Sequence, residues 1–550
     1  MSALANRFSL FKRIEWILLS LLSALLLNLA FPYPGYSLFA WICLVPFFIV
    51  IMTQTLKRVF LGAIITGIAF NVVYLIWMKE YKHPATLSGG VFLQLLYFLF
   101  AAFLFWMLRR LLDDFRSQDG RRSPKSPGFL REPRSLGIMV ISALLCTTAW
   151  LLVDYLKTIG YLAFPWGILG YSQYKNLLLI QSARLFGVWG IDFVLLFSNV
   201  TIASLLVELR ETGRWRGSRG NLMLLACAVL LILLFGAREL EVEKKQELRK
   251  ARIALIQGNL DPWSPQLTEN IQVGIELTRM AMEQDPDLVV WSESSVPFPY
   301  EYYLARGEKH ALRIQQFAQS LGRPLLFGSI EFDGILENGE YSGDFYNVAI
   351  LYRKGRLADV YRKIHLVPFG EWFPYERLFP FVSLILEKAG AGDFTPGTEY
   401  VVFDMEGFTA SVLICFEDVF GNLTRMFIPH NPELFINVTN DAWTGSEKAE
   451  VQHFSISVFR TVETRRSLVR AANGGVTVCV NPYGRIIDSL PLFTSDYLVC
   501  DVPLQEGNMT TLYVRWGDFF PKWLGVIFLA FLLALGVKKV IDRKKKKNIM

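Results

Sequence analysis

Few residues of this sequence belong to the types that build disulfide frameworks and metal sites. Six cysteines and five histidines are spread over 550 residues, and no two cysteines stand in a CxxC pattern. So few cysteines do not make a disulfide framework in a chain of this length, and scattered histidines do not form a metal-binding motif. We therefore expect no metal site and no other cofactor.

Long polar segments are missing from two parts of the chain. Hydrophobic residues make up 53% of the sequence and charged residues 19%, with a mean hydropathy of +0.34. This average is too high for a soluble protein unless apolar and polar residues are segregated along the chain. We predict a membrane domain of seven helices at 1–238, a globular domain at 239–517, an eighth membrane helix at 518–537 and a basic tail at 538–550.

Eight apolar runs are long enough to cross the roughly 30 Å hydrocarbon layer of a bilayer. Basic residues beside them gather in the loops after the second, fourth and sixth runs and in the tail. Because such residues stay in the cytoplasm, we expect both termini there and 239–517 on the outer face. This topology explains the net charge of +7, so we expect a membrane and not nucleic acid as partner. The predicted spans are 14–31, 37–53, 58–78, 90–108, 136–156, 184–207, 221–238 and 518–537.

The segment 239–517 alternates short β-rich runs with helical stretches, a pattern typical of an α/β fold in which helices cover a sheet. The expected strands are 252–257, 288–291, 325–330, 346–352, 410–415, 434–437 and 476–481, and the expected helices include 266–283, 308–321 and 452–472.

Cys415 is a candidate nucleophile because it ends the apolar run 410–414 and enters a turn or helix. A thiol in this place can use the exposed N–H groups of the next segment, which lower its pKa and can hold an oxyanion. Taken alone, a cysteine that ends a buried strand is more often a packed small hydrophobic residue.

Two charged residues could serve such a nucleophile. Glu293 directly follows the strand predicted at 288–291, where partial burial would raise its pKa toward that of a useful base. Lys363 could stabilise a developing oxyanion with its fixed charge. An isolated glutamate is more often a helix cap or loop ion pair, and an isolated lysine is usually solvated.

The sequence around Glu293, Lys363 and Cys415 favours a catalytic role over a structural one. The segments WSESSVP, YRKIHLVPFGE and SVLICFED contain Glu293, Lys363 and Cys415, and in this order they resemble the nitrilase superfamily. Membrane helices on both sides narrow the resemblance to the apolipoprotein N-acyltransferases of bacterial envelopes. NDAWTG at 440–445 and the stretch from VQHF to NGG at 451–475 resemble further blocks of that family.

The resemblance implies a fold and a set of roles. The fold is a polytopic α-helical membrane domain joined to a nitrilase-like α-β-β-α sandwich. Glu293 is then the base, Lys363 the oxyanion-stabilising cation and Cys415 the nucleophile that carries a thioester. Glu371 positions Lys363 or accepts a proton from the attacking amine, and Glu417 is a further supporting acid.

Aromatic residues are the expected substrate contacts. The candidates are Trp263, Trp443, Trp166 in the FPW…GYSQ segment, and Phe416. Two positions depart from the family pattern, because Phe416 stands where tyrosine is common and Thr444 where phenylalanine is common.

The implied reaction moves a fatty acyl chain from a phospholipid, phosphatidylethanolamine by resemblance, to the N-terminal α-amine of a diacylglyceryl-cysteine lipoprotein. The implied site is the periplasmic face of the bacterial inner membrane. One alternative is a membrane-tethered nitrilase-type amidase, which would release free acid to water. Another is a silent lipid-binding or scaffold protein, against which fast alkylation of Cys415 at neutral pH would argue.

Overall fold

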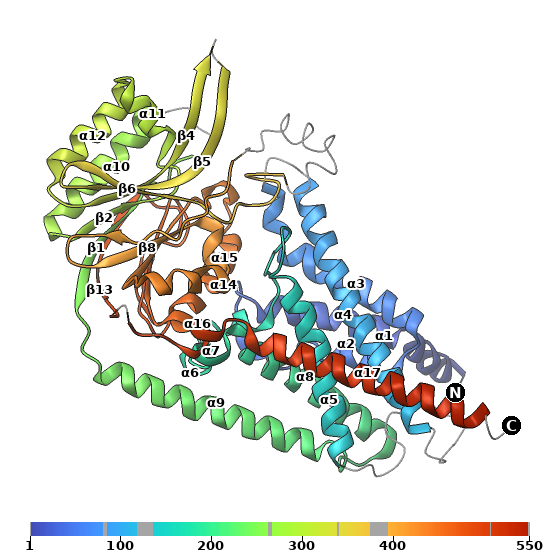
Figure 1. Ribbon diagram of the computed structural model, residues 1–550. Helices are drawn as coiled ribbons and strands as arrows, with labels where there is room; N and C mark the ends of the chain where they lie inside the picture. The colour runs from blue at the N-terminus through green and yellow to red at the C-terminus, as the bar shows by residue number, and fades with distance from the viewer. Residues whose placement is uncertain are drawn as a thin grey trace.

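The protein has a helical bundle and an α/β part, which Figure 1 shows side by side. The computed structural model describes residues 2–80, 85–117, 136–261, 267–337, 340–373, 394–506 and 508–547. The first turns of α1 and the last turns of α17 lie at the same end of the bundle, away from the sheets (Figure 1).

Long apolar helices build the bundle. Seven helices within the described ranges are long and apolar enough to cross a membrane, and each coincides with one of the eight predicted spans. They are α1 (Ser2–Ala30), α3 (Leu56–Tyr74), α4 (Ala85–Ser117), α5 (Leu136–Leu156), α8 (Val188–Thr212), α9 (Arg219–Lys245) and α17 (Phe519–Lys547).

The second predicted span, 37–53, differs because it is not one continuous helix. A 3-10 turn, Ser37–Trp41, is followed by the nine-residue helix α2 (Val45–Thr53). Backbone groups freed by such a break inside a membrane need partners from the protein. Asn199 of α8 supplies two of them, since its Oδ1 accepts from Leu44 N at 2.7 Å and its Nδ2 donates to Ala40 O at 2.8 Å.

This interrupted segment still runs the depth of the bundle. Near the catalytic side, Ser37 O accepts a hydrogen bond from Gln173 Nε2 at 2.9 Å. Near the other side, Ile51 O accepts one from Arg109 Nη1 at 2.6 Å, and Arg109 lies in the second half of α4. The two pieces together therefore reach from one side of the bundle to the other.

The α/β part contains two sheets. In spatial order the first has β13 (Asp496–Pro503), β1 (Lys250–Gln257), β2 (Leu288–Trp291), β4 (Leu325–Glu337), β5 (Glu340–Arg353) and β6 (Arg356–Arg362), with β3 (Val296–Pro299) paired to β4. The second has β12 (Ile486–Ser489), β11 (Val478–Val480), β10 (Ser467–Ala472), β9 (Leu434–Thr439), β8 (Thr409–Ile414) and β7 (Phe403–Asp404). Strands occur in all seven predicted regions.

Three apolar cores separate the layers. One lies between the two sheets and includes Val290 of β2 and Ile436 of β9. Another joins the outer face of the first sheet to α10 (Leu267–Ala281) and α12 (Lys309–Leu321). The third joins the second sheet, through α15 (Glu447–Thr464), to the membrane bundle. The predicted α-β-β-α sandwich is thus confirmed, with α15 facing the bundle.

The helix predicted over 452–472 is wrong in its last part. Helix α15 ends at Thr464, Arg465 adopts a left-handed φ of 54°, and Ser467–Ala472 forms β10 between β9 and β11. All six residues of β10 are buried, so pairing on both edges decides the structure. As a result Arg470 points into the protein and not to solvent.

A disulfide that we did not predict joins the sheets. Cys479 of β11 is bonded to Cys500 of β13, with their Cα atoms 6.9 Å apart. It connects the second sheet to the first across their common core, since both half-cystines lie in the core between the sheets.

Candidate active site

The three candidate catalytic residues come from three strand ends. Glu293 follows β2, Lys363 follows β6 and Cys415 follows β8, so the first sheet supplies two of them and the second sheet one. Gly328 of β4 lets the chain pass close to Glu293, because a Cβ there would lie 2.6 Å from the Glu293 Cα.

Lys363 lies at the centre of a buried group that we call the lysine cluster: Glu293, Asn347, Lys363 and Glu371. Its Nζ is 2.8 Å from Glu371 Oε1 and 3.6 Å from Glu293 Oε1, and only 1% of its side chain is exposed. Burial alone would lower the pKa of Lys363, but the charges of the two carboxylates outweigh burial and raise it. Lys363 is therefore a permanent cation.

Asn347 of β5 aligns the two carboxylates of this cluster. Its Nδ2 donates to Glu293 Oε1 and to Glu371 Oε1, both at 2.8 Å. The other Glu293 oxygen accepts from Asn440 N at 2.8 Å. Burial raises the pKa of Glu293 and the charge of Lys363 only partly offsets this, which favours a carboxyl group that can exchange a proton.

Cys415 begins a short 3-10 helix, Cys415–Val419, and has a left-handed φ of 50°. Such a conformation in a residue with a side chain is strained and common at active sites. Burial, together with the charges of Glu293 and Asp441, raises the pKa of its thiol well above the ordinary value, although Lys363 lowers it. The expectation of a lowered thiol pKa is therefore wrong for the resting protein, because burial outweighs the nearby cation.

Glu417 ties the nucleophile to the lysine-bearing segment. Its Oε1 accepts hydrogen bonds from Ile364 N at 2.7 Å and His365 N at 3.0 Å, and its Oε2 accepts from Ile414 N at 2.8 Å. Tyr361 OH donates to both oxygens. The side chain is fully buried, and burial raises its pKa to about 7. Glu417 thus joins the backbone that follows Lys363 to the backbone that precedes Cys415.

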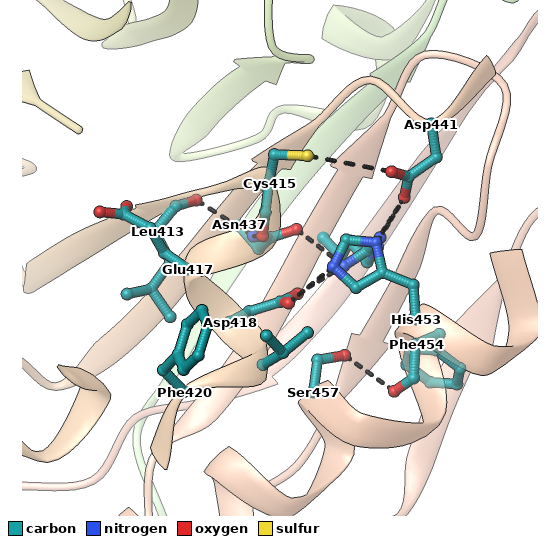
Figure 2. Close-up of polar contacts among 12 residues, drawn as sticks. Leu413, Cys415, Glu417, Asp418, Phe420, Asn437, Asp441, His453, Phe454 and Ser457 are labelled. Atoms are coloured by element: carbon teal, nitrogen blue, oxygen red, sulfur yellow. Dashed lines mark hydrogen bonds and ion pairs between the residues drawn. The ribbon is translucent and has the colours of Figure 1, made fainter. Parts of the chain in front are cut away.

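A second buried group also contacts the thiol, as Figure 2 shows in part. This arginine cluster comprises Asp418, Asp441, His453 and Arg470. His453 Nδ1 lies 2.8 Å from Asp441 Oδ2 and its Nε2 lies 2.9 Å from Asp418 Oδ1, so both ring nitrogens face carboxylates. Arg470 Nη2 donates to Asp441 Oδ2 at 2.6 Å, and its Nη1 donates to Asp418 Oδ2.

The arginine cluster reaches the nucleophile through Asp441. Cys415 Sγ lies 3.9 Å from Asp441 Oδ1, the contact drawn at the top of Figure 2. Burial alone would raise the pKa of Asp441, but His453 and Arg470 outweigh it and hold that pKa below its ordinary value. The carboxylate beside the thiol is therefore ionised.

Aromatic side chains join the site to the membrane domain. Trp166 is buried and stacks on Phe416, with ring centroids 5.8 Å apart. Trp77 lies 6.4 Å from Trp166 and 6.1 Å from Trp443, centroid to centroid. Three of the four predicted aromatic contacts are thus together, whereas Trp263 lies outside the described residues.

Sequence reasoning did not single out the residues that complete the site. Asp441 lies in the NDAWTG segment, just after β9, and His453 and Arg470 lie in the VQHF-to-NGG segment. The resemblance of these two segments to the family was therefore the available signal for a role in the site. Asn347 sits within a strand and Trp77 in an apolar run, and neither carries a local signal.

Comparisons with known proteins cover both halves of the chain. A family model described as the apolipoprotein N-acyltransferase N-terminal domain matches residues 23–201, and one described as carbon-nitrogen hydrolase matches residues 252–510. The chain is 33% identical over 536 residues to the apolipoprotein N-acyltransferase of Geobacter metallireducens, with 95% of each chain covered.

A second N-acyltransferase and a solved amidase structure are also similar to this chain. The chain is 30% identical over 565 residues to apolipoprotein N-acyltransferase 1 of Treponema denticola, covering 96% of this chain and 98% of that protein. The crystal structure of an amidase from Nesterenkonia sp. matches 47% of this chain and 92% of that chain, at 20% identity and a TM-score of 0.34.

Similarity to the N-acyltransferases extends through the membrane half, which an amidase acting in water does not require. The amidase alternative is therefore not favoured. With both domains matched and nearly the whole length covered, the chain belongs to the apolipoprotein N-acyltransferase family of bacterial membrane proteins.

Proposed function

We propose that the protein transfers a fatty acyl chain from a phospholipid to the α-amine of a diacylglyceryl-cysteine lipoprotein, with Cys415 as the carrier. Glu293 takes the thiol proton and Cys415 attacks an ester carbonyl of the phospholipid. Lys363 stabilises the oxyanion with a charge that does not titrate. The C–O bond breaks, the proton on Glu293 passes to the leaving lysophospholipid, and a thioester remains.

Deprotonation of the thiol is then coupled to its attack on the ester carbonyl. The resting thiol has a raised pKa, so a free thiolate would be rare at neutral pH. Proton transfer to Glu293 as the S–C bond forms avoids that free thiolate. Phosphatidylethanolamine is the donor that the family resemblance supports.

The observation that carries the proposal is the contact between the membrane domain and the nucleophile's neighbour. Trp166, from the membrane half, stacks on Phe416, the residue next to Cys415. Keeping an acyl chain out of water is worth about 0.8 kcal/mol per CH₂, so a lipid-handling thiol gains from an apolar aromatic surface that continues into the bundle. A water-using amidase gains nothing from it.

We place the catalytic domain, 239–517, on the periplasmic face and both termini in the cytoplasm. The basic clusters support this orientation. The Cys479–Cys500 disulfide supports it independently, because disulfides persist in the periplasm and are rare in the cytoplasm. We also propose the domain bounds 1–238, 239–517, 518–537 and 538–550, in which both half-cystines lie within the catalytic domain.

Purified protein in phospholipid vesicles, supplied with a synthetic diacylglyceryl-cysteine peptide, tests the proposal. Mass spectrometry of the peptide is expected to show one added acyl chain for the native chain and none for Cys415→Ala, with folding and insertion unchanged. Turnover retained by Cys415→Ala would contradict the mechanism. Free fatty acid released with no acylated peptide would favour the amidase.

A further inference from the structure

The negative charge of Asp441 does not help the first half of the reaction. Its Oδ1 lies 3.9 Å from Cys415 Sγ, and this charge is among the causes that raise the thiol pKa. A carboxylate beside a nucleophilic thiol opposes formation of the thiolate. Asp441 Oδ2 nevertheless lies 2.8 Å from His453 Nδ1 and accepts from Arg470 Nη2 at 2.6 Å, and both contacts lower the pKa of Asp441.

The same charge suits the second half of the reaction. Once Cys415 carries an acyl group, its sulfur is uncharged, so repulsion between thiolate and carboxylate no longer applies. The attacking amine must come within about 3–3.5 Å of the carbonyl carbon bonded to that sulfur. An α-amine at neutral pH is largely protonated, so it arrives as an ammonium group beside the carboxylate that faces Sγ.

Three other carboxylates near the reacting groups are committed to different partners, and Glu450, which accepts from Thr444 Oγ1, has no contact with the thiol among the described residues. Glu371 is held by Lys363, Asn347 and the backbone of Val367. Glu417 accepts bonds from the segments on either side of it and is fully buried. Asp418 is fully buried and lies between His453 and Arg470, away from the thiol.

We propose that Asp441 binds the α-ammonium group of the acyl acceptor beside the Cys415 thioester, and so selects a charged amine over water and over uncharged nucleophiles. This inference rests on the proposed function and assigns the acceptor-binding residue within it. His453 and Arg470 are positioning residues, because they orient Asp441 and keep it charged.

The ammonium held by Asp441 loses one proton to Glu293, which releases it to water. The nitrogen lone pair of the free amine then forms the C–N bond, and Lys363 holds the oxyanion. The C–S bond breaks, and a second nitrogen proton passes through Glu293 to the Cys415 sulfur. The products are an amide and the free thiol.

The test separates the two half-reactions on the full-length protein in vesicles. The thioester is formed from phospholipid and then discharged with the diacylglyceryl-cysteine peptide or with hydroxylamine, which is uncharged at neutral pH. For Asp441→Asn we expect the KM for the peptide to rise about 10-fold to 100-fold, the range of one lost charged hydrogen bond. Discharge by hydroxylamine is expected to stay within about threefold of the native rate.

Asp418→Asn is the matched control. It weakens the hold of His453 and Arg470 but leaves the Asp441 carboxylate beside the thiol, so the ratio of peptide to hydroxylamine rates is expected to change by less than about tenfold. Equal slowing of both acceptors in Asp441→Asn, or the same change of ratio in Asp418→Asn, would overturn the proposal and leave Asp441 a structural role.

A second readout does not need turnover. Removing the charge of Asp441 lowers the thiol pKa, so the pH profile for alkylation of Cys415 by iodoacetamide is expected to move to lower pH in Asp441→Asn and not in Asp418→Asn. An unmoved profile would overturn the placement of this charge. Absence of a thioester in the native chain would instead sink the proposed function itself, so the two failures are distinct.

Discussion

Two buried charge clusters flank Cys415, and they differ in how completely their carboxylates are neutralised. In the lysine cluster, Glu293 and Glu371 share one cation, Lys363, and the pKa of Glu293 is raised. In the arginine cluster, Asp418 and Asp441 share two cations, and the pKa of Asp441 is lowered. The pKa of Glu293 is raised because its one cation only partly offsets burial, whereas Asp441 has two partners on Oδ2 that lower its pKa and leave Oδ1 facing the thiol.

Within the lysine cluster, removing the base Glu293 is expected to slow thioester formation the most. Glu293→Gln keeps the shape of the side chain but cannot take the thiol proton, so the rate of thioester formation is expected to fall about 100-fold to 10 000-fold. Intact mass spectrometry of quenched single-turnover samples measures this rate. A loss below about tenfold would mean that another group accepts the proton.

Removing the cation gives the next largest effect. Lys363→Met takes away the oxyanion-stabilising charge, and thioester formation is expected to slow about 100-fold to 1000-fold. It also leaves Glu293 beside Glu371 without a cation, which raises the pKa of Glu293 further. Lys363→Arg is the control, since it keeps the charge with a different shape. Full activity in Lys363→Met would contradict the assigned role.

The arginine cluster is expected to make stability depend on alkaline pH. Burial opposes protonation of His453, but Asp441 and Asp418 outweigh it and raise its pKa from 6.5 to about 9. Because the pKa of His453 is higher in the folded state than in the unfolded state, protonated His453 stabilises the fold. This stabilisation is complete below about pH 6.5 and is lost as pH rises through about 9. The free energy of unfolding is expected to fall by about 3 kcal/mol over this range.

Thermal unfolding in detergent as a function of pH measures the His453 effect. The native chain is expected to lose stability as pH rises through this window, and His453→Gln is expected to flatten the dependence. A native profile that stays level across the window would show that His453 is not protonated.

Glu417, which accepts hydrogen bonds from the backbone next to Lys363 and Cys415, gives the smallest effect of the four. Glu417→Gln replaces one acceptor oxygen by an NH₂ group, which then faces backbone N–H donors. We expect the free energy of unfolding to fall by about 1–3 kcal/mol. Tyr361→Phe removes a single donor to Glu417 and is expected to cost less, so chemical denaturation of the two variants tests the order. Equal stability of Glu417→Gln and the native chain would contradict this role.

Features that depend on local sequence could be predicted. Glu293, Lys363 and Cys415 each follow a recognisable strand, and the strand ends bring them to one place. The apolar runs predicted eight spans, and seven of these are long apolar helices in the described ranges, since length and hydropathy are local properties.

Features that depend on residues distant in the sequence could not be predicted. The break in 37–53 is stabilised by Asn199, a residue far along the chain. The strand that carries Arg470 looks helical in isolation and is decided by its two neighbouring strands. The raised thiol pKa of Cys415 likewise follows from burial, which no short motif reveals.

The most direct test of the account is the mass of the intact protein after incubation with phospholipid and a chase with the diacylglyceryl-cysteine peptide. We predict an acyl adduct that depends on Cys415 and moves quantitatively to the peptide amine. An adduct that persists in Cys415→Ala, or product formed without any adduct, would contradict the claim that this thiol carries the acyl chain.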